Sequence, residues 1–303
     1  MTLSELKYVV ALSQERHFGR AAERCFVSQP TLSVAVKKLE DELGISIFER
    51  SKSAVSITPL GEQVIRQAQV VLENASTLKS IAEGGKDQLT GPLKIGAIFT
   101  IGPYLFPHLI PQVQALAPQM PLYIEENYTR VLRKKLSDGE LDMIIIALPF
   151  KESDVLTKEL YDEPFEVLLP AQHPWLVMQQ INPNLLPDSD LMLLGDGHCF
   201  RDQVIDMCPA LARQKNNQNS QLKAIAEGSS LETLRHMVAS GLGITVLPKS
   251  ATGVQHYTSD MLHTRPFISP APKRTVAIAW RASFPRPKAV DLITQAASLC
   301  RLF

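Results

Sequence analysis

The chain has 303 residues, and with 45% hydrophobic and 20% charged residues it can bury a sizeable core and lacks the composition of a disordered protein. At roughly 150 residues per domain, this length predicts two or three domains. The 31 Lys and Arg residues balance 31 Asp and Glu residues, so the net charge is zero. This balance excludes a uniformly basic nucleic-acid coat and a polybasic membrane anchor, but it permits a local basic surface.

The N-terminal segment shows neither the basic start nor the apolar stretch of a secretory signal. The longest apolar run covers about residues 143–148, far below the roughly 18 residues that a membrane span requires. We therefore expect a soluble cytoplasmic protein with no membrane partner.

The cysteines do not form a recognisable metal or disulfide framework. There is no Cys-x-x-Cys, the seven histidines do not gather at zinc spacing, and thiols in a cytosolic chain of this length are normally reduced. We expect no metal, no cofactor and no structural disulfide, so that any disulfide would be transient. The four cysteines are Cys25, Cys199, Cys208 and Cys300.

The first sixty residues have the pattern of short helices joined by tight turns. Apolar residues recur at helical spacing over residues 3–12, and an alanine-rich helix is expected over 19–24. Residues 25–27 should form a turn whose apolar side chains pack inward. Ser28 is a suitable N-cap for a third helix, with Pro30 in its first turn and Gly44 at its end. Two helices joined in this way resemble a helix-turn-helix.

Two short β-prone runs, residues 45–50 and 55–58, predict a hairpin, or wing, tipped with Arg50 and Lys52. Pro59 then opens a run without proline or glycine over residues 62–83, whose apolar positions suit a helix that packs against a partner. The predicted organisation is a winged helix-turn-helix domain over residues 1–60, a dimerising linker helix over 61–85, a hinge over 86–91, and a further domain over 92–303.

From residue 91 onward, predicted strands and helices alternate. The strands are expected at 93–98, 122–126, 141–148, 165–169, 191–194, 243–247 and 275–280. The helices are expected at 104–116, 130–137, 229–240 and from 288 to the end of the chain. This alternation predicts largely parallel sheets with helices on both faces, and the segment is long enough for two such lobes with a cleft between them.

The N-terminal residues resemble the signature of LysR-type transcriptional regulators at 18–22 (FGRAA), 28–33 (SQPTLS), 38–40 (KLE), 43–44 (LG), 47–50 (IFER) and 58–61 (TPLG). The resemblance implies an all-α winged helix-turn-helix with a long linker helix, then an α/β two-lobed effector domain like a periplasmic binding protein. It implies double-stranded promoter DNA and RNA polymerase as partners. It also implies a homodimer through the linker helix, a homotetramer on DNA, and a bacterial cytoplasmic location at the nucleoid.

A second resemblance lies in residues 195–203 (GDGHCFRDQ), followed by Cys208. This run is similar to the redox switch of OxyR, the peroxide-sensing subfamily of LysR-type regulators, and residues 91–93, 100–105 and 230–235 also look like that subfamily. Phe200 stands where the subfamily usually has leucine, a difference that we expect to alter the packing or the rate of the switch.

A cysteine that senses peroxide needs a lowered pKa and access, because the thiolate is the nucleophile. His198 and Arg201 place cationic or hydrogen-bonding groups near Cys199, and a helix beginning there would also favour a thiolate. A helix would separate the Cα atoms of Cys199 and Cys208 by ~13.5 Å, whereas a disulfide reaches at most about 7 Å. From spacing alone, two unrelated core cysteines remain an alternative; the resemblance favours a peroxidatic Cys199 and a resolving Cys208.

The resemblance also implies a peroxide site around Cys199. Thr100 and Thr129 would offer hydroxyls to hydrogen peroxide, which has two donor hydrogens and two acceptor oxygens. His198, Asp202 and Arg274 would surround that pocket. Without the resemblance, Thr100 would be interpreted as a strand-end cap, Thr129 as a helix N-cap, and Arg274 as a solvated or salt-bridged arginine.

The third helix is the predicted DNA-reading element, because recognition helices read base edges from their first turns. Residues 1–66 carry nine Lys and Arg against eight Asp and Glu, so the helix pattern rather than charge carries this hypothesis. Phosphate contacts are expected from Lys37 and Lys38 on the helix, and from Arg50 and Lys52 on the wing. The expected base-reading and helix-start residues are Gln29, Pro30, Thr31, Ser33 and Val34.

The leading hypothesis is a regulator of antioxidant genes, switched by peroxide through a reversible Cys199–Cys208 disulfide, and not an enzyme. A LysR-type regulator that binds a small metabolite in its cleft, with incidental cysteines, is the main alternative. A thiol peroxidase would need the same cysteine pair but has no use for a helix-turn-helix. A solute-binding transport protein is a weaker alternative, because no export signal is visible.

Overall fold

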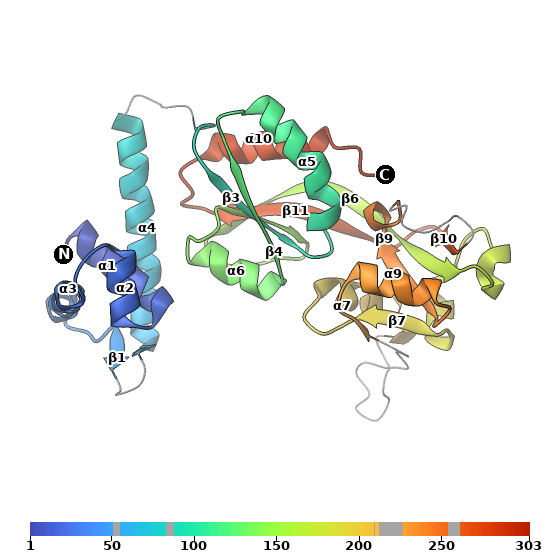
Figure 1. The fold of residues 1–303 in the computed structure, drawn as a ribbon, viewed down its shortest axis with the longest axis horizontal. Helices are drawn as coiled ribbons and strands as arrows, with labels where there is room; N and C mark the ends of the chain where they lie inside the picture. Colours follow the sequence, from blue (N-terminus) through green and yellow to red (C-terminus); the bar gives the residue numbers. More distant parts are fainter. Residues whose placement is uncertain (51–54, 83–87, 209, 212–226, 254–260) are drawn as a thin grey trace. The chain divides into compact units, whose positions relative to one another are not determined.

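The computed structural model describes residues 1–303 except 51–54, 83–87, 209, 212–226 and 254–260 (Figure 1). The chain forms two compact units. The first contains residues 1–88 with the short segments 134–140 and 281–287, and the second contains the remaining residues. In the described part of the chain, no helix combines the length and the apolar character that crossing a bilayer would require.

The N-terminal elements confirm the predicted winged helix-turn-helix. Helices α1 (Leu3–Glu15), α2 (Phe18–Arg24) and α3 (Gln29–Leu43) precede the antiparallel pair β1 (Phe48–Arg50) and β2 (Val55–Ile57), and α4 (Pro59–Ala82) follows. The Ser28 hydroxyl caps α3 by accepting from the Thr31 amide, and Gly44 ends it in the left-handed conformation. Leu12, Leu32 and further fully buried apolar residues form the core of this domain.

The turn between α2 and α3 differs from the expectation. Phe26 adopts a left-handed backbone conformation (φ 57°) and its side chain is 95% exposed. The neighbouring Cys25 and Val27 are half-buried and do pack against the core. The prediction that this turn packs its apolar residues inward is therefore wrong for Phe26, because the sharp turn points alternate side chains in opposite directions.

The first lobe of the effector domain is an α/β layer structure. Strand β3 (Leu93–Ile98) pairs in parallel with β4 (Leu122–Asn127) and β5 (Met143–Ala147), and β11 (Lys273–Arg281) pairs antiparallel with β5. Helices α5 (Gly102–Leu116), α6 (Thr129–Ser137) and α10 (Pro287–Ser298) belong to this lobe. Every residue of β5 is buried, as expected for a central strand covered on both faces.

The second lobe continues the same sheet, in the order β4-β3-β5-β11-β6-β9-β7-β8, with β10 paired to β6. Its strands are β6 (Val155–Pro170), β7 (Leu191–Leu194), β8 (Glu227–Gly228), β9 (Ile244–Pro248) and β10 (Leu262–Pro266). Its helices are α7 (Cys199–Asp206) and α9 (Leu231–Ala239), with the short 3₁₀ turns η1 (Pro174–Val177), η2 (Pro183–Asp188) and η3 (Lys249–Ala251). In Figure 1, α9 and α7 lie against the strands of this lobe.

The two-lobed α/β architecture is confirmed, but the sheet is more mixed than predicted. β6 pairs antiparallel with both β9 and β10, and β11 is antiparallel to β5. β6 also runs for 16 residues, whereas the sequence suggested only residues 165–169. Its first half is mostly exposed and polar, so it lacks the apolar run that identified its second half.

Gly61, in the first turn of α4, lies in a close approach between that helix and the segment before the wing. A Cβ at this position would lie 2.2 Å from the Ile47 carbonyl oxygen, which also accepts from the Thr58 amide at 3.0 Å. The Thr58 hydroxyl oxygen would lie 2.9 Å from the same Cβ. Only glycine therefore allows α4 to start here without moving backbone.

We predict that Gly61→Ala lowers the free energy of unfolding of the N-terminal domain by about 1–3 kcal/mol, because overpacking forces the backbone apart. The measurement is urea unfolding followed by circular dichroism. Gly253→Ala is the control, since a Cβ there meets nothing within 4 Å. Equal unfolding midpoints for the two variants would show that the helix start tolerates the added methyl group.

Candidate functional site

A small cavity lies beside Cys199, where the carboxyl ends of the parallel strands β3 and β4 meet the turn before α7. Ligands commonly bind at this edge of α/β sheets. The centre of a water-sized molecule could move within about 10 Å³ of this cavity, so the cavity has room for about one such molecule. The cavity is lined by Ile98, Phe99, Thr100, Asn127, Tyr128, Thr129, Gly197, His198 and Cys199.

Two polar atoms in the wall of this cavity have no partner in the described part of the chain. They are the buried hydroxyl oxygen of Thr129 and the buried Nε2 of His198. Buried polar groups are normally hydrogen-bonded, so this pair favours a small polar guest. Thr129 is the first residue of α6, but its hydroxyl makes no capping bond, and its interpretation as an N-cap is therefore wrong.

His198 is held with its ring against aromatic neighbours. The ring is only 6% exposed, and its centroid lies 4.8 Å from that of Tyr128 and 6.0 Å from that of Phe99. Burial lowers the pKa of His198 below its usual value, while a hydrogen bond with the Ser229 backbone partly opposes the shift. At neutral pH the ring is therefore uncharged, and donation to Ser229 from Nδ1 leaves Nε2 free to accept a proton.

The turn before Cys199 depends on Gly197, whose φ of +94° is unfavourable for other residues. A Cβ at Gly197 would lie 3.4 Å from the Tyr128 ring. This turn brings His198 and Cys199 up to the edge of the first lobe. The cavity is thus formed by both lobes, with the threonines from one and the thiol and imidazole from the other.

Cys199 begins α7, Cys208 lies two residues beyond its last residue, Asp206, and both cysteines are free thiols. Cys199 is the first residue of the helix and is half-buried, whereas Cys208 is fully buried in the core of the second lobe. α7 ends at Asp206, and its seven steps from Cys199 span ~10.5 Å, which already exceeds the roughly 7 Å that a disulfide allows. An intact α7 therefore disfavours a bond between the two thiols, although the helix stops short of Cys208 and covers less of the segment than the spacing argument assumed.

Arg274 lies next to the cavity but not in its lining. Its guanidinium donates from Nη1 to the Thr100 hydroxyl oxygen at 2.9 Å and from Nη2 to the Thr100 carbonyl at 2.7 Å. Its Nε donates to Glu163 Oε2 at 2.7 Å, and both side chains of this ion pair are 0% exposed. It also lies 5.3 Å from the centroid of the Phe200 ring. The interpretation of Arg274 as salt-bridged is confirmed.

Sequence reasoning therefore brought together Thr100, Thr129, His198 and Cys199, and the structure places all four around one cavity. Asp202 is exposed on the first turn of α7 and does not line that cavity. Glu163 was missed, because a carboxylate in the middle of a strand gives no local signal and its partner lies 111 positions away.

Phe200, the residue after Cys199, is fully buried. Its ring makes an edge contact with Phe165, with centroids 5.0 Å apart, and the Arg274 guanidinium lies over its face. Aromatic–aromatic and cation–π contacts of this kind add to the burial of the ring. A leucine at position 200 could pack against the same neighbours, but it could make neither the aromatic contact with Phe165 nor the cation–π contact with Arg274.

The proposed DNA-reading residues lie on an open face of α3. Gln29, Thr31 and Lys37 are exposed, and Val34 is 68% exposed, which is unusual for an apolar residue without a partner surface. Pro30 is also exposed, and Ser33 is half-buried. Arg50 ends β1, whereas Lys52 lies outside the described residues.

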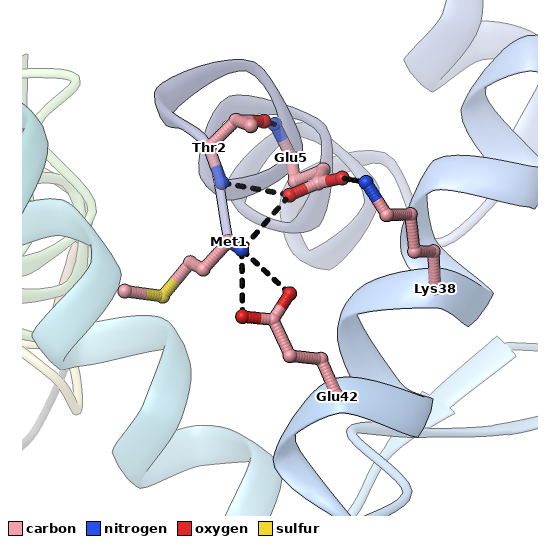
Figure 2. A network of polar contacts seen from close by, with 5 residues as sticks. All are labelled: Met1, Thr2, Glu5, Lys38 and Glu42. Carbon is pink, nitrogen blue, oxygen red and sulfur yellow. Dashed lines mark hydrogen bonds and ion pairs between the residues drawn. The ribbon is translucent and has the colours of Figure 1, made fainter.

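Lys38 differs from Lys37, because it has an ionic partner within its own domain (Figure 2). Its ammonium donates to Glu5 Oε1 at 3.0 Å, and Glu5 is 5% exposed. The same Glu5 accepts from the Thr2 amide in a capping box, and the Met1 ammonium contacts Glu42 at 2.5 and 2.7 Å. The hydrogen bond from Lys38 lowers the pKa of Glu5. This network ties α1 to α3.

Two protein-family models match this chain. One is described as the bacterial regulatory helix-turn-helix protein, lysR family, and matches residues 3–62; the other is the LysR substrate binding domain and matches residues 86–299. The chain belongs to the LysR family. Within this LysR protein, the cavity and both cysteines lie in the substrate binding domain.

Relatives place this LysR protein in the OxyR subfamily. The DNA-binding transcriptional dual regulator OxyR of Escherichia coli K12 is 37% identical over 98% of this chain and 94% of its own length. A full-length OxyR from Pseudomonas aeruginosa with the substitution C199D is 62% identical, covers 100% of this chain and 96% of that one, and superposes with a TM-score of 0.87. An oxidized Corynebacterium glutamicum OxyR, 32% identical, covers 98% and 91% with a TM-score of 0.57.

We predict that iodoacetamide alkylates Cys199 of the native protein about tenfold faster than the other three cysteines at neutral pH. Burial raises the pKa values of the Cys25 and Cys300 thiols, which reduces their thiolate fractions, and Cys208 has no exposed surface. Peptide mass spectrometry gives the four rates. In urea the rates should converge; native alkylation of Cys208 as fast as Cys199 would show that α7 opens readily.

Proposed function

We propose that this chain is a hydrogen-peroxide-sensing transcriptional regulator of antioxidant genes. The observation that carries this proposal is a half-buried thiol, Cys199, at a water-sized cavity with two unpartnered polar atoms, those of Thr129 and His198. Relatives with the printed name hydrogen peroxide-inducible genes activator support it. Room for about one water-sized molecule does not favour the alternative of a larger metabolite at this position.

The chemistry begins with the Cys199 thiolate, which attacks one oxygen of hydrogen peroxide. A sulfur–oxygen bond forms, the oxygen–oxygen bond breaks, and the second oxygen leaves as water after taking one proton. The products are a sulfenic acid at Cys199 and one water molecule. The unpartnered Nε2 of His198 and the hydroxyl of Thr129 are suited to hold the peroxide hydrogens during this step. Thr100 completes the proposed set in the wall of the cavity, whereas Asp202 and Arg274 do not line it and belong to the set only as neighbouring residues.

The second step joins the two cysteines. The Cys208 sulfur attacks the sulfenic sulfur of Cys199, a disulfide forms, and a second water leaves. Because α7 lies between the two residues and by itself spans more than the reach of a disulfide, the helix would have to unwind and Cys208 would have to leave the core. The disulfide therefore selects a second packing of this segment, which is the switching element of the proposed regulator.

DNA binding and assembly complete the proposal. Helix α3 would enter the major groove of promoter DNA, and α4 would pair with α4 of a second copy to form a homodimer. Leu78, 68% exposed on α4, and the half-buried Val64, Val71 and Leu72 are apolar side chains that such a pairing would cover. A homotetramer on DNA, contact with RNA polymerase and a bacterial cytoplasmic location at the nucleoid are proposed with it.

The test is mass spectrometry of the full chain, alkylated before and after stoichiometric peroxide. We expect a Cys199–Cys208 linked peptide that appears within seconds to minutes and reverses with a dithiol. Cys208→Ser should stop at the sulfenic acid, and Cys199→Ser should show no oxidation of Cys208. Continued alkylation of Cys199 in the presence of peroxide would overturn the proposal. Steady peroxide consumption with a reductant would instead indicate a thiol peroxidase.

DNA binding gives a separate prediction from the contrast between two neighbouring lysines. Lys37→Ala should reduce the slope of the logarithm of DNA affinity against the logarithm of salt concentration by about one unit per bound subunit, because one phosphate contact is lost. Lys38→Ala should change that slope less, because the Lys38 ammonium is engaged by Glu5. Fluorescence anisotropy with promoter DNA at several salt concentrations measures both. Equal slope changes would show that DNA displaces the Glu5 ion pair.

A further inference from the structure

Glu163 is a buried carboxylate one step removed from the cavity. Its Oε1 accepts from the Ser250 amide at 2.9 Å, and its Oε2 accepts from Arg274 Nε at 2.7 Å. The carboxylate and the guanidinium are both completely inaccessible. Burying such a pair is costly in free energy unless its geometry is well satisfied, so the pair is a weak means of gaining stability. The groups that the Glu163–Arg274 pair contacts indicate a role other than stability.

The pair contacts Thr100, and the direction of that contact decides the state of the hydroxyl. Arginine is a donor only, so the 2.9 Å bond from Arg274 Nη1 makes the Thr100 oxygen an acceptor. The hydroxyl hydrogen is not used in that bond and remains available to the cavity that Thr100 lines. The second bond, from Nη2 to the Thr100 carbonyl, fixes the backbone of the same residue.

This arrangement distinguishes Thr100 from Thr129. The Thr129 oxygen has no partner in the residues that the structure describes, so its hydroxyl can turn to donate or to accept. The Thr100 hydroxyl instead has its donor role set by a charge-assisted bond, which also polarises the O–H group. A fixed donor is most valuable where negative charge develops, which during peroxide cleavage is the oxygen that leaves.

We infer that Glu163 is a positioning residue for peroxide reduction, which holds Arg274 so that Thr100 is a fixed hydrogen-bond donor to the leaving oxygen. The inference rests on the proposed function, because the leaving oxygen is that of a peroxide attacked by Cys199. Arg274 acts through Thr100 and need not touch the peroxide. The Ser250 amide donates to the Glu163 carboxylate, and the Phe200 ring packs against the Arg274 guanidinium.

The test is a double-mutant cycle on the second-order rate of Cys199 oxidation by hydrogen peroxide, measured by rapid mixing and alkylation of the full chain. Thr100→Val removes the hydroxyl and should lower the rate by about 10²-fold. Glu163→Gln keeps the shape but offers one acceptor to two donors, and should lower the rate roughly tenfold. In the Thr100→Val background, Glu163→Gln should have no further effect, whereas in the Thr129→Val background its tenfold effect should persist.

A second reagent separates positioning from general damage. Iodoacetamide also reacts with the Cys199 thiolate, but its iodide leaving group needs no proton or donor. Glu163→Gln should therefore leave the alkylation rate unchanged while it lowers the peroxide rate. If Glu163→Gln does not fold, Arg274→Lys replaces it, because lysine keeps the charge beside Glu163 without the fork that reaches both oxygens of Thr100.

The outcomes are distinguishable. Equal slowing of the peroxide and iodoacetamide reactions would overturn the positioning role and leave Glu163 as a structural residue. Additive effects of Glu163→Gln and Thr100→Val would also overturn it, because the two residues would then act separately. If the wild-type thiol reacts with peroxide no faster than free cysteine, the proposed function itself fails, and this inference fails with it.

Discussion

A disulfide joins Cα atoms no more than about 7 Å apart, whereas the seven helical steps of α7, from Cys199 to Asp206, already span ~10.5 Å before the chain reaches Cys208. The reduced packing is stabilised by burial of Phe200, Val204 and Ile205, each at most 2% exposed. At about 1.5–3 kcal/mol for each side chain, unwinding α7 costs on the order of 5–9 kcal/mol before new contacts form. In the proposed switch, an intact α7 and a Cys199–Cys208 disulfide would therefore exclude one another, which would give two states instead of a continuous range.

The cavity is coupled to this packing by Arg274. Its guanidinium lies over the ring of Phe200, in the helix that must unwind, and it donates to Thr100, in the wall of the cavity. Movement of Phe200 out of the core would therefore remove the ring that packs against the Arg274 guanidinium. The group that holds Thr100 is thus in contact with the segment that would rearrange in the proposed switch, so the packing of α7 and the geometry of the cavity would change together.

Local chemistry made much of the fold predictable. The cap of α3 by Ser28 and its end at Gly44 depend on side chains within a few positions, and both were recognisable in the sequence. The polar half of β6 was not predictable, because an exposed strand is specified by its partner strands and not by its own apolar pattern. Glu163 was missed for the same reason: its hydrogen bonds reach partners 87 and 111 positions away in the chain.

The site illustrates the same division between local and long-range information. Cys199 and His198 adjoin in sequence, so their chemistry was visible there. Thr129 was interpreted as a cap from its position, because sequence does not reveal whether a hydroxyl faces its own helix or a cavity formed by the other lobe. The resemblance to a known family supplied that contact before the structure did, and the unpartnered oxygen supplies the physical reason for it.

Size and polarity together determine what this site can accept. The threonine, imidazole and thiol groups converge on space for about one water-sized molecule, and the Gly197 turn keeps the wall close to Tyr128. A larger metabolite would have to displace aromatic side chains that pack on one another, whereas hydrogen peroxide exceeds water by a single oxygen atom. Its hydrogens and lone pairs match one fixed donor at Thr100 and one free acceptor at His198. Selectivity of the proposed sensor for hydrogen peroxide would thus follow from the exclusion of larger molecules and from the few polar atoms of the cavity that have no partner among the described residues.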